Sequence, residues 1–502
     1  SFDHALRQFY DLMPLASLPT RCGVGDFGKA SYEFADILHE MGASIWQILP
    51  LNTVGLGDSP YSGTSAFAGN YLYIDPEKLA EDGAITRADA HAAEYPGEPY
   101  SVDYAFCRAS KRAVVRKAFE SGVYAHGDIE KYRRDNAGWL DDYALYMSVK
   151  DMMGGLPWWR WDEEYLRREK HALDAVRGSE EYAYYVFEQF LFDRQWAQVR
   201  KKLASRGISI IGDMPMYVSH DSADVWAHPD IFRLDKDMNP AAVAGVPPDY
   251  FSADGQLWGN PLYDIERLKK TGYKWWLERL ERAMSWYDVL RIDHFRAFSR
   301  YWSVPAGSET AREGKWEKGL GMEFLKKVFA AMPEARFIAE DLGIIDDGVR
   351  ELLQKSGLPG MRVMQFGFED GDSIHLPHNF DRFCIGYTAT HDNNTTLGWL
   401  QQLPENVRDY VLRYIRCNSF GWSSGGYGCK STKAFYRKLA ESSCVLAIVP
   451  FQDMCGFGAD CRMNTPGVAD GNWKYRATYE NLEGVDCAFF NEINSLYGRN
   501  RS

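Results

Sequence analysis

The sequence predicts an α/β fold of the (β/α)8 TIM-barrel class, with helical insertions between barrel strands. Short apolar runs that resemble buried strands alternate with amphipathic helical segments, a rhythm typical of a parallel sheet. Charged residues gather where several runs end, and active residues of barrels lie at the carboxyl ends of strands. The predicted strands number eight, as a closed barrel requires: 44–51, 71–75, 208–215, 288–293, 336–340, 361–367, 383–390 and 444–451.

A doubly wound open sheet is the alternative arrangement of such elements. It is not favoured, because no Gly-x-Gly-x-x-Gly dinucleotide loop follows a predicted strand.

The first predicted βα region contains a helix near 30–41 and the strand 44–51, which ends at a proline. The polar stretch 52–70 follows, rich in serine, glycine and aromatic residues. A loop of this length in a compact domain is more often functional than idle. It leads into the second predicted strand, 71–75.

Residues 77–200 are charged and helical in period, which predicts a mostly helical insertion subdomain within one catalytic domain spanning 1–502. A long helix from Glu180 to about Arg206 closes it. The strand that follows carries Asp213 at its carboxyl end, and 218–262 is then expected to form an active-site loop insertion.

The segment from Asp288 to Arg296 is the most informative strand. Side chains alternate across a strand, so Arg291 and Asp293 share one face while Leu290 and Ile292 share the other. An adjacent cation favours the ionised form of Asp293. Taken alone, this is also what a structural Arg–Asp pair looks like.

A predicted helix at 272–286 precedes the strand 288–293, and predicted helices at 320–331 and 344–356 precede the strands 336–340 and 361–367. Polar residues also end several of the later strands. Convergence of several carboxylates on one barrel mouth is expected of glycosidic-bond chemistry, in which one carboxylate attacks and another transfers the proton. The strand-end residues are Asp213, Arg291, Asp293, Glu340, Asp341, His391 and Asp392.

Composition excludes several classes of protein. A net charge of −13 argues against nucleic-acid and anionic-membrane partners, and no apolar run is long enough to span a bilayer. The nine cysteines form no CxxC, and the start has no basic segment followed by an apolar one, so reduced thiols in a cytoplasmic protein are expected. Cys455 and Cys461 have no clustered partner, so no metal site is predicted. No cofactor is expected either, because a glycosyl-enzyme formed on a carboxylate needs none.

Three motifs carry a family resemblance: Arg291-Ile-Asp-His-Phe, Ala339-Glu-Asp-Leu-Gly and Thr390-His-Asp-Asn-Asn-Thr. They resemble the 4-α-glucanotransferases (amylomaltases, glycoside hydrolase family 77) of the α-amylase clan. Further matches run along the chain, among them Ser59-Pro-Tyr-Ser, Val243-Ala-Gly-Val-Pro-Pro-Asp-Tyr-Phe-Ser, Arg462-Met-Asn-Thr-Pro-Gly and Gly471-Asn-Trp. The opening segment 12–19 is looser than the usual family pattern.

The resemblance implies that Asp293 is the nucleophile, Glu340 the general acid/base and Asp392 the carboxylate that holds sugar hydroxyls. Glu340 should then have a pKa above the ~4.3 of a free glutamate, and its carboxyl should lie roughly 5–5.5 Å from that of Asp293. The implied substrate-binding residues are Tyr61, Asp213, Trp258, Asn260, Arg291, His294 and His391.

The resemblance also implies transfer of an α-1,4-glucan segment through a covalent glycosyl-enzyme, from maltooligosaccharide donors to glucose or another maltooligosaccharide. Transfer requires a cover that limits water, for which the loop 245–263 is suited by its Pro-Pro pair and by Tyr250, Phe251, Trp258 and Asn260. The alternatives are an α-1,4-glucan hydrolase with the same carboxylates and a non-catalytic sugar-binding barrel. We expect a monomer or weak homodimer.

Overall fold

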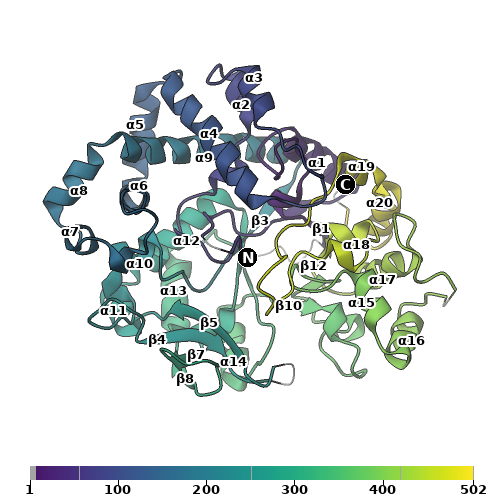
Figure 1. The fold of residues 1–502 in the computed structure, drawn as a ribbon. Helices are drawn as coiled ribbons and strands as arrows, with labels where there is room; N and C mark the ends of the chain where they lie inside the picture. Colours follow the sequence, from purple (N-terminus) through teal and green to yellow (C-terminus); the bar gives the residue numbers. More distant parts are fainter. Residues whose placement is uncertain (1–6, 56, 250–251, 419, 501–502) are drawn as a thin grey trace.

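The computed structural model describes residues 7–55, 57–249, 252–418 and 420–500, and its centre is a barrel of eight parallel strands (Figure 1). Neighbouring strands follow chain order around the barrel, and β12 pairs with β1. The last gap closes where the Ala339 N–H donates to the Pro359 carbonyl over 3.0 Å. The TIM-barrel prediction is confirmed. The strands are β1 (Gln8–Leu12), β2 (Ile45–Gln47), β3 (Ser209–Met214), β6 (Val289–Ile292), β9 (Phe337–Ala339), β10 (Gly360–Val363), β11 (Cys384–Tyr387) and β12 (Leu446–Pro450).

One predicted strand is wrong, and one barrel strand was missed. The run 71–75 begins with a 3-10 turn, η2 (Tyr71–Tyr73), because the Asn70 side chain caps it by accepting from the Leu72 N–H. Asp75 is then the N-cap of helix α2 (Pro76–Glu81), so the residues between the two caps are too few to form a strand. The barrel instead uses β1, whose sequence Gln-Phe-Tyr-Asp-Leu has no uninterrupted apolar run.

Asp11 on β1 is the least satisfied carboxyl of the described core. It is 0% exposed, and neither of its oxygens has a hydrogen-bond partner among the described residues. Phe9, on the same face of the strand, packs against Tyr436 and Phe490, so this face turns toward the outer helices. Burial raises the pKa of Asp11 well above its usual range.

Replacing Asp11 by leucine should stabilise the protein. An unsatisfied buried polar group costs ~1–3 kcal/mol, so the free energy of unfolding should rise by that order. A carboxyl with a raised folded pKa is protonated in the folded chain at pH values where the unfolded chain has lost the proton. Stability is then lost as pH rises from ~3.9 through the folded pKa. Denaturant melts should show a larger gain at pH 8 than at pH 4; an equal gain at both would contradict an ionising Asp11.

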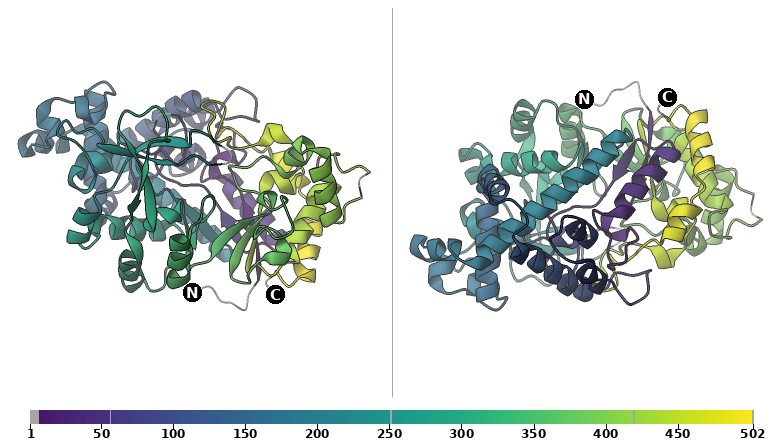
Figure 2. Two further views of the ribbon diagram at one scale, coloured as in Figure 1. Left: turned by 90° about the horizontal axis from the view of Figure 1, so that it is seen from below. Right: turned by 90° about the horizontal axis from the view of Figure 1, so that it is seen from above.

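The long segment between β2 and β3 is helical and lies to one side of the barrel (Figure 2). Its last helix, α9, runs back toward the barrel and delivers β3. The helix α1 (Lys29–Glu40), which precedes β2, agrees with the predicted helix near 30–41. The helices of the segment are α2 (Pro76–Glu81), α3 (Arg87–Ala92), α4 (Tyr104–Ser121), α5 (His126–Asp135), α6 (Ala137–Met152), α7 (Glu163–Leu166), α8 (Lys170–Arg177) and α9 (Glu180–Ser205).

A second excursion, 218–262, was expected as a loop but contains regular structure. After α10 (Ala223–Ala227) it forms β4 (Ala242–Val246) and β5 (Gln256–Pro261). These strands join β7 (Arg300–Pro305) and β8 (Lys315–Lys318) in an antiparallel sheet of order β5-β4-β7-β8. Glycines and prolines obscure the alternation of this stretch, which is why the sequence reads as a loop. Trp258 and Asn260 therefore lie on a strand.

The remaining helices cover the barrel between its later strands. Predicted helices at 272–286, 320–331 and 344–356 correspond to α12, α13 and α14. Within the described ranges, no helix is long and apolar enough to cross a membrane. The helices are α11 (Ile265–Lys270), α12 (Lys274–Trp286), α13 (Gly321–Ala331), α14 (Asp347–Ser356), α15 (Thr396–Gln402), α16 (Glu405–Tyr414), α17 (Lys430–Ala440), α18 (Phe451–Met454), α19 (Tyr479–Gly484) and α20 (Cys487–Leu496).

Candidate active site

Arg291 is hydrogen-bonded to two aspartates in a buried charge network at the barrel mouth. Strand register sets Arg291 of β6 opposite Asp213 of β3. Its Nη1 donates to both Asp213 carboxylate oxygens, at 2.8 and 2.9 Å, and to Asp293 Oδ1 at 3.2 Å. The Tyr61 hydroxyl donates to the same Asp213 carboxylate. Asp213 and Arg291 are almost fully buried, whereas the Asp293 side chain is 31% exposed. The network therefore presents Asp293, and not Asp213, to a ligand.

Removing the guanidinium should destabilise the whole protein. In an Arg291→Met variant, Asp213 is left as a buried charge without its cation, a loss that typically costs ~3–5 kcal/mol. Denaturant melts of Arg291→Met and of the double variant Asp213→Asn/Arg291→Met provide the measurement. We expect the double variant to regain part of the loss. A loss below ~1 kcal/mol in Arg291→Met would show that the pair contributes little.

Glu340 follows β9 and is held by backbone groups. Its Oε2 accepts from the His294 N–H at 2.7 Å, and its Oε1 accepts from the Leu342 N–H at 2.8 Å. It is 9% exposed. Burial raises the pKa of Glu340, and the opposing pull of Arg291 and the two N–H groups is smaller. The direction agrees with the sequence expectation. The Glu340 carboxyl can thus stay protonated at pH values above the range in which a glutamate usually ionises.

Asp293 lies one residue beyond β6, beside Arg291. Burial raises its pKa, and the Arg291 guanidinium opposes the rise by stabilising the carboxylate. The Asp213, Glu340 and Asp392 carboxylates raise it further. Carboxyls coupled in this way titrate as a group, so the group carries fewer negative charges than it has carboxyls. Because Arg291 donates to Asp293 directly, Asp293 is the member of the Asp293–Glu340 pair best placed to stay ionised. The predicted distance of roughly 5–5.5 Å between the two carboxyls stays a prediction.

Asp392 is placed by the segment that links β11 to α15. Its Oδ1 accepts from Asn464 Nδ2 at 2.7 Å and lies 3.3 Å from His391 Nε2. Arg462 donates to the Asp392 backbone carbonyl at 2.7 Å. The Asp392 side chain is 45% exposed, so a ligand can reach it. Asn464 lies within the Arg462-Met-Asn-Thr-Pro-Gly motif but was given no role, because nothing in the motif shows that it reaches a residue 72 positions earlier in the chain.

Aromatic rings wall the mouth beside Asp392. Tyr61 stacks on His391 with ring centroids 5.1 Å apart, and Trp473 packs 5.7 Å from Tyr61. Burial lowers the pKa of His391. The structure thus brings Tyr61, Asp213, Asp293 and His391 into one cluster, in which Asp213 is buried. Trp473 was within a motif of the family resemblance but was given no role.

On the other side of Asp293, His294 adopts a left-handed backbone with φ of 50°. This conformation is uncommon for a residue with a side chain and is often found at functional sites. Burial lowers the pKa of His294 to about 3, so its ring is neutral, and its Nε2 has no partner among the described residues. The Trp258 ring lies 4.8 Å away, edge to face. A neutral, almost fully buried imidazole thus lies beside an exposed indole.

Asn260 is held by a backbone carbonyl, and its predicted contact with substrate stays a prediction. Its side-chain amide donates to the Val218 carbonyl at 3.0 Å, so its nitrogen joins β5 to the segment after β3. Tyr250 and Phe251, two residues of the predicted cover, lie outside the described residues.

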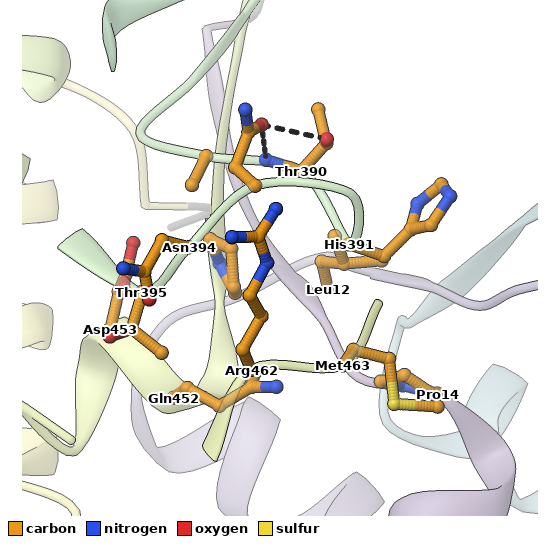
Figure 3. A pocket seen from close by; sticks show the side chains of 13 residues that line it. Leu12, Pro14, Thr390, His391, Asn394, Thr395, Gln452, Asp453, Arg462 and Met463 are labelled. Carbon is orange, nitrogen blue, oxygen red and sulfur yellow. Dashed lines mark hydrogen bonds between the residues drawn. The ribbon is translucent and has the colours of Figure 1, made fainter. Parts of the chain in front are cut away.

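A small cavity of about 20 Å³ lies behind His391, where β1, β11 and β12 end (Figure 3). Arg462 stands between Asn394 and His391 in this view. Asp453, at the cavity wall, accepts from the Thr396 N–H and hydroxyl and so fixes the start of α15. The cavity is too small for a sugar. It belongs to the framework that holds His391 and Asp392.

Among the described residues, only Glu164, Glu169 and His171, at the surface around α7 and α8, place three potential metal-ligand atoms near one another. Cys455 and Cys461 are not in this group, and all nine cysteines are free thiols.

Comparison with known proteins gives consistent matches. The family described as 4-alpha-glucanotransferase matches residues 13–481. A 4-alpha-glucanotransferase of Aquifex aeolicus is 42% identical over 97% of this chain and 98% of its own. One from Streptococcus pneumoniae is 40% identical over 98% and 97%. The amylomaltase of Streptococcus agalactiae, solved in complex with acarbose, is 37% identical with a TM-score of 0.94, and the match covers 99% of this chain and 100% of that one.

Proposed function

Because the chain belongs to the 4-alpha-glucanotransferase family, we propose that Asp293, Glu340 and Asp392 are the residues that carry out its reaction. The chain is a 4-α-glucanotransferase of the TIM-barrel type, and transfer is favoured over hydrolysis. The observation that carries the assignment of roles is the contrast between the two carboxyls beside Arg291. Asp293 is accessible and bonded to a cation, whereas Asp213 is sealed beneath it.

In the first step, Glu340 donates its proton to the glycosidic oxygen while an Asp293 oxygen attacks the anomeric carbon. The bond to the leaving sugar breaks, and an ester forms between Asp293 and the donor glucan. In the second step, the ionised Glu340 takes a proton from the 4-OH of an acceptor sugar, whose oxygen displaces Asp293. No cofactor is needed, since the carboxylate itself carries the glucosyl group.

The remaining residues have binding roles in this proposal. Asp392 accepts hydrogen bonds from sugar hydroxyls, with Asn464 and His391 fixing its orientation. Tyr61 offers a ring to the sugar at the reaction centre, and Asp213 and Arg291 hold Tyr61 and Asp293 in place.

On the acceptor side we place Trp258, His294 and Asn260. The indole of Trp258 is 39% exposed, so it offers a flat apolar surface to the C–H face of a sugar. The neutral His294 ring can bond a hydroxyl without adding charge. A sugar held here excludes water and favours transfer.

Product analysis on maltotriose tests this proposal. Transfer releases glucose and builds a ladder of longer maltooligosaccharides from donors of one length, without a net gain of reducing ends. We expect this ladder in chromatograms of the reaction. Glucose and maltose with a matching gain of reducing ends would instead show that water is the main acceptor.

We also propose the coarser organisation expected from the sequence: one catalytic domain over 1–502, with 77–200 as an insertion subdomain and 218–262 as an active-site insertion. Maltooligosaccharides are the donors, and glucose or maltooligosaccharides are the acceptors.

Nine free thiols are consistent with a cytoplasmic location. A monomer or weak homodimer is proposed, which sedimentation would measure.

A further inference from the structure

The helices of the insertion surround an open cavity of about 750 Å³. Its walls come from α4, α5, α6 and α9 and from the end of α8. A volume of this order is typical of small-molecule sites. In Figures 1 and 2, α5, α6 and α8 lie at the end of the molecule opposite α15–α20, and α9 runs from them toward the barrel. Of the described residues that line the cavity, none belongs to the catalytic network.

One wall of the cavity is aromatic. Phe119 and Phe187 pack with ring centroids 5.5 Å apart, and Tyr124 lies 5.6 Å from Phe187. Phe187 is 3% exposed and anchors the group, while the rings of Phe119 and Tyr124 are partly accessible. Accessible flat rings of this kind offer an apolar surface to the C–H face of a pyranose.

The other wall carries positively and negatively charged side chains that pair with one another. Arg177 donates from Nε and Nη2 to the two oxygens of Asp141, at 3.0 and 2.9 Å. The Tyr182 hydroxyl donates to Asp141 at 2.7 Å. Arg133 donates twice to one oxygen of Glu130, at 3.1 and 2.8 Å.

Each guanidinium of the cavity already has a carboxylate partner. An anionic ligand would therefore have to compete with the resident acids for the arginines. A neutral polyol would not, because the paired groups keep spare N–H donors and oxygen lone pairs that can bond hydroxyls. An apolar ring wall facing a satisfied polar wall matches a sugar, which has C–H faces and a hydroxyl edge.

We propose that this cavity is a binding site for a short segment of α-1,4-glucan, separate from the reaction centre. The inference rests on the transferase activity, since that activity brings the enzyme to such glucans. A chain held here raises the local concentration of other chain ends at the mouth, as any second attachment point does. The effect should be confined to long glucans, because a short oligosaccharide cannot span both sites.

The test fills the cavity. Ala183 and Ala137 are exposed alanines on its rim, so Ala183→Trp and Ala137→Trp place a ring in the space without removing a buried side chain. Ala204→Trp is the matched control, an exposed alanine on the same helix as Ala183 and away from the cavity. Each is made in an Asp293→Asn background, and retention in glycogen-containing native gels reports the affinity.

We expect the dissociation constant for glycogen to rise at least threefold in the two filled variants and to stay unchanged in Ala204→Trp. Tyr124→Ala should weaken retention, while Tyr124→Phe, which keeps the ring, should not. Unchanged retention in both filled variants would overturn the proposal.

The same substitutions in the active chain should leave the rate on maltotriose unchanged, which confirms that each variant folds. If the assignment of Asp293 as the nucleophile were wrong, the Asp293→Asn protein would still form products. This outcome is distinct from any change in glycogen retention.

Discussion

Asp293→Asn should abolish glucan transfer while leaving the fold and glucan binding intact. The substitution keeps the size of the side chain and its place beside Arg291 but removes the oxygen nucleophile. Loss of a nucleophile that acts with a partner acid typically costs several orders of magnitude, so we expect kcat to fall by roughly 10⁴-fold or more. Initial rates of glucose release from maltotriose, measured with the thermal midpoint of each protein, are the assay.

Asp213→Asn is the matched control for that experiment. Both aspartates bond Arg291, but only Asp293 has an accessible carboxylate. Asp213→Asn should therefore weaken binding and stability more than it slows chemistry, and activity should remain measurable. If Asp293→Asn kept activity near that of the unaltered protein, the covalent mechanism would be wrong.

Glu340→Gln should produce the second large loss, of roughly 10²–10⁴-fold, because general acid–base catalysis contributes about this much. The loss should depend on the leaving group. α-Maltosyl fluoride, which needs little protonation to depart, should form the glycosyl-enzyme at a rate much closer to that of the unaltered protein. The enzyme should then stall, since no base activates the acceptor. Mass spectrometry of the protein should detect the trapped ester.

The pH profile gives an independent check on Glu340. The general acid must carry its proton when the donor binds, so kcat/KM falls as pH rises through its pKa. Burial raises that pKa, which moves the fall to higher pH than an ordinary glutamate would allow. The alkaline limb should be present on maltotriose and reduced on α-maltosyl fluoride. An identical limb on both substrates would assign it to another group.

Much of the barrel follows from local pattern, and its exceptions have physical causes. Strands such as 288–293 and 444–451 are apolar runs between helices, so their assignment needs no tertiary information. β1 was missed because Asp11 and Gln8 interrupt its apolar run, and both are buried only after β2 and β12 flank it. The run 71–75 was assigned wrongly because Asn70 and Asp75 act as caps, a choice made by side-chain hydrogen bonds.

The candidate site also contains residues that the sequence predicts and residues that it does not. Asp293 and Glu340 each lie one residue beyond a barrel strand, and Asp392 lies in the segment that follows β11, so the barrel topology places all three at the carboxyl ends of strands. Asn464 and Trp473 could not be placed, since they reach the mouth from a segment far along the chain. The small sheet that carries Trp258 forms by pairing β4 with β7, across about sixty residues, and local sequence gives no hint of that partnership.

The pairing of β1 with β12 ties the earliest described strand to one more than 430 positions later. During synthesis, every other barrel strand leaves the ribosome before β12 does. Until then β1 and β11 each have an unpaired edge, and such edges are prone to aggregate. Closing a parallel barrel through so distant a contact is intrinsically slow. The nascent chain therefore spends most of its translation as an open sheet, the stage at which chaperone protection matters most.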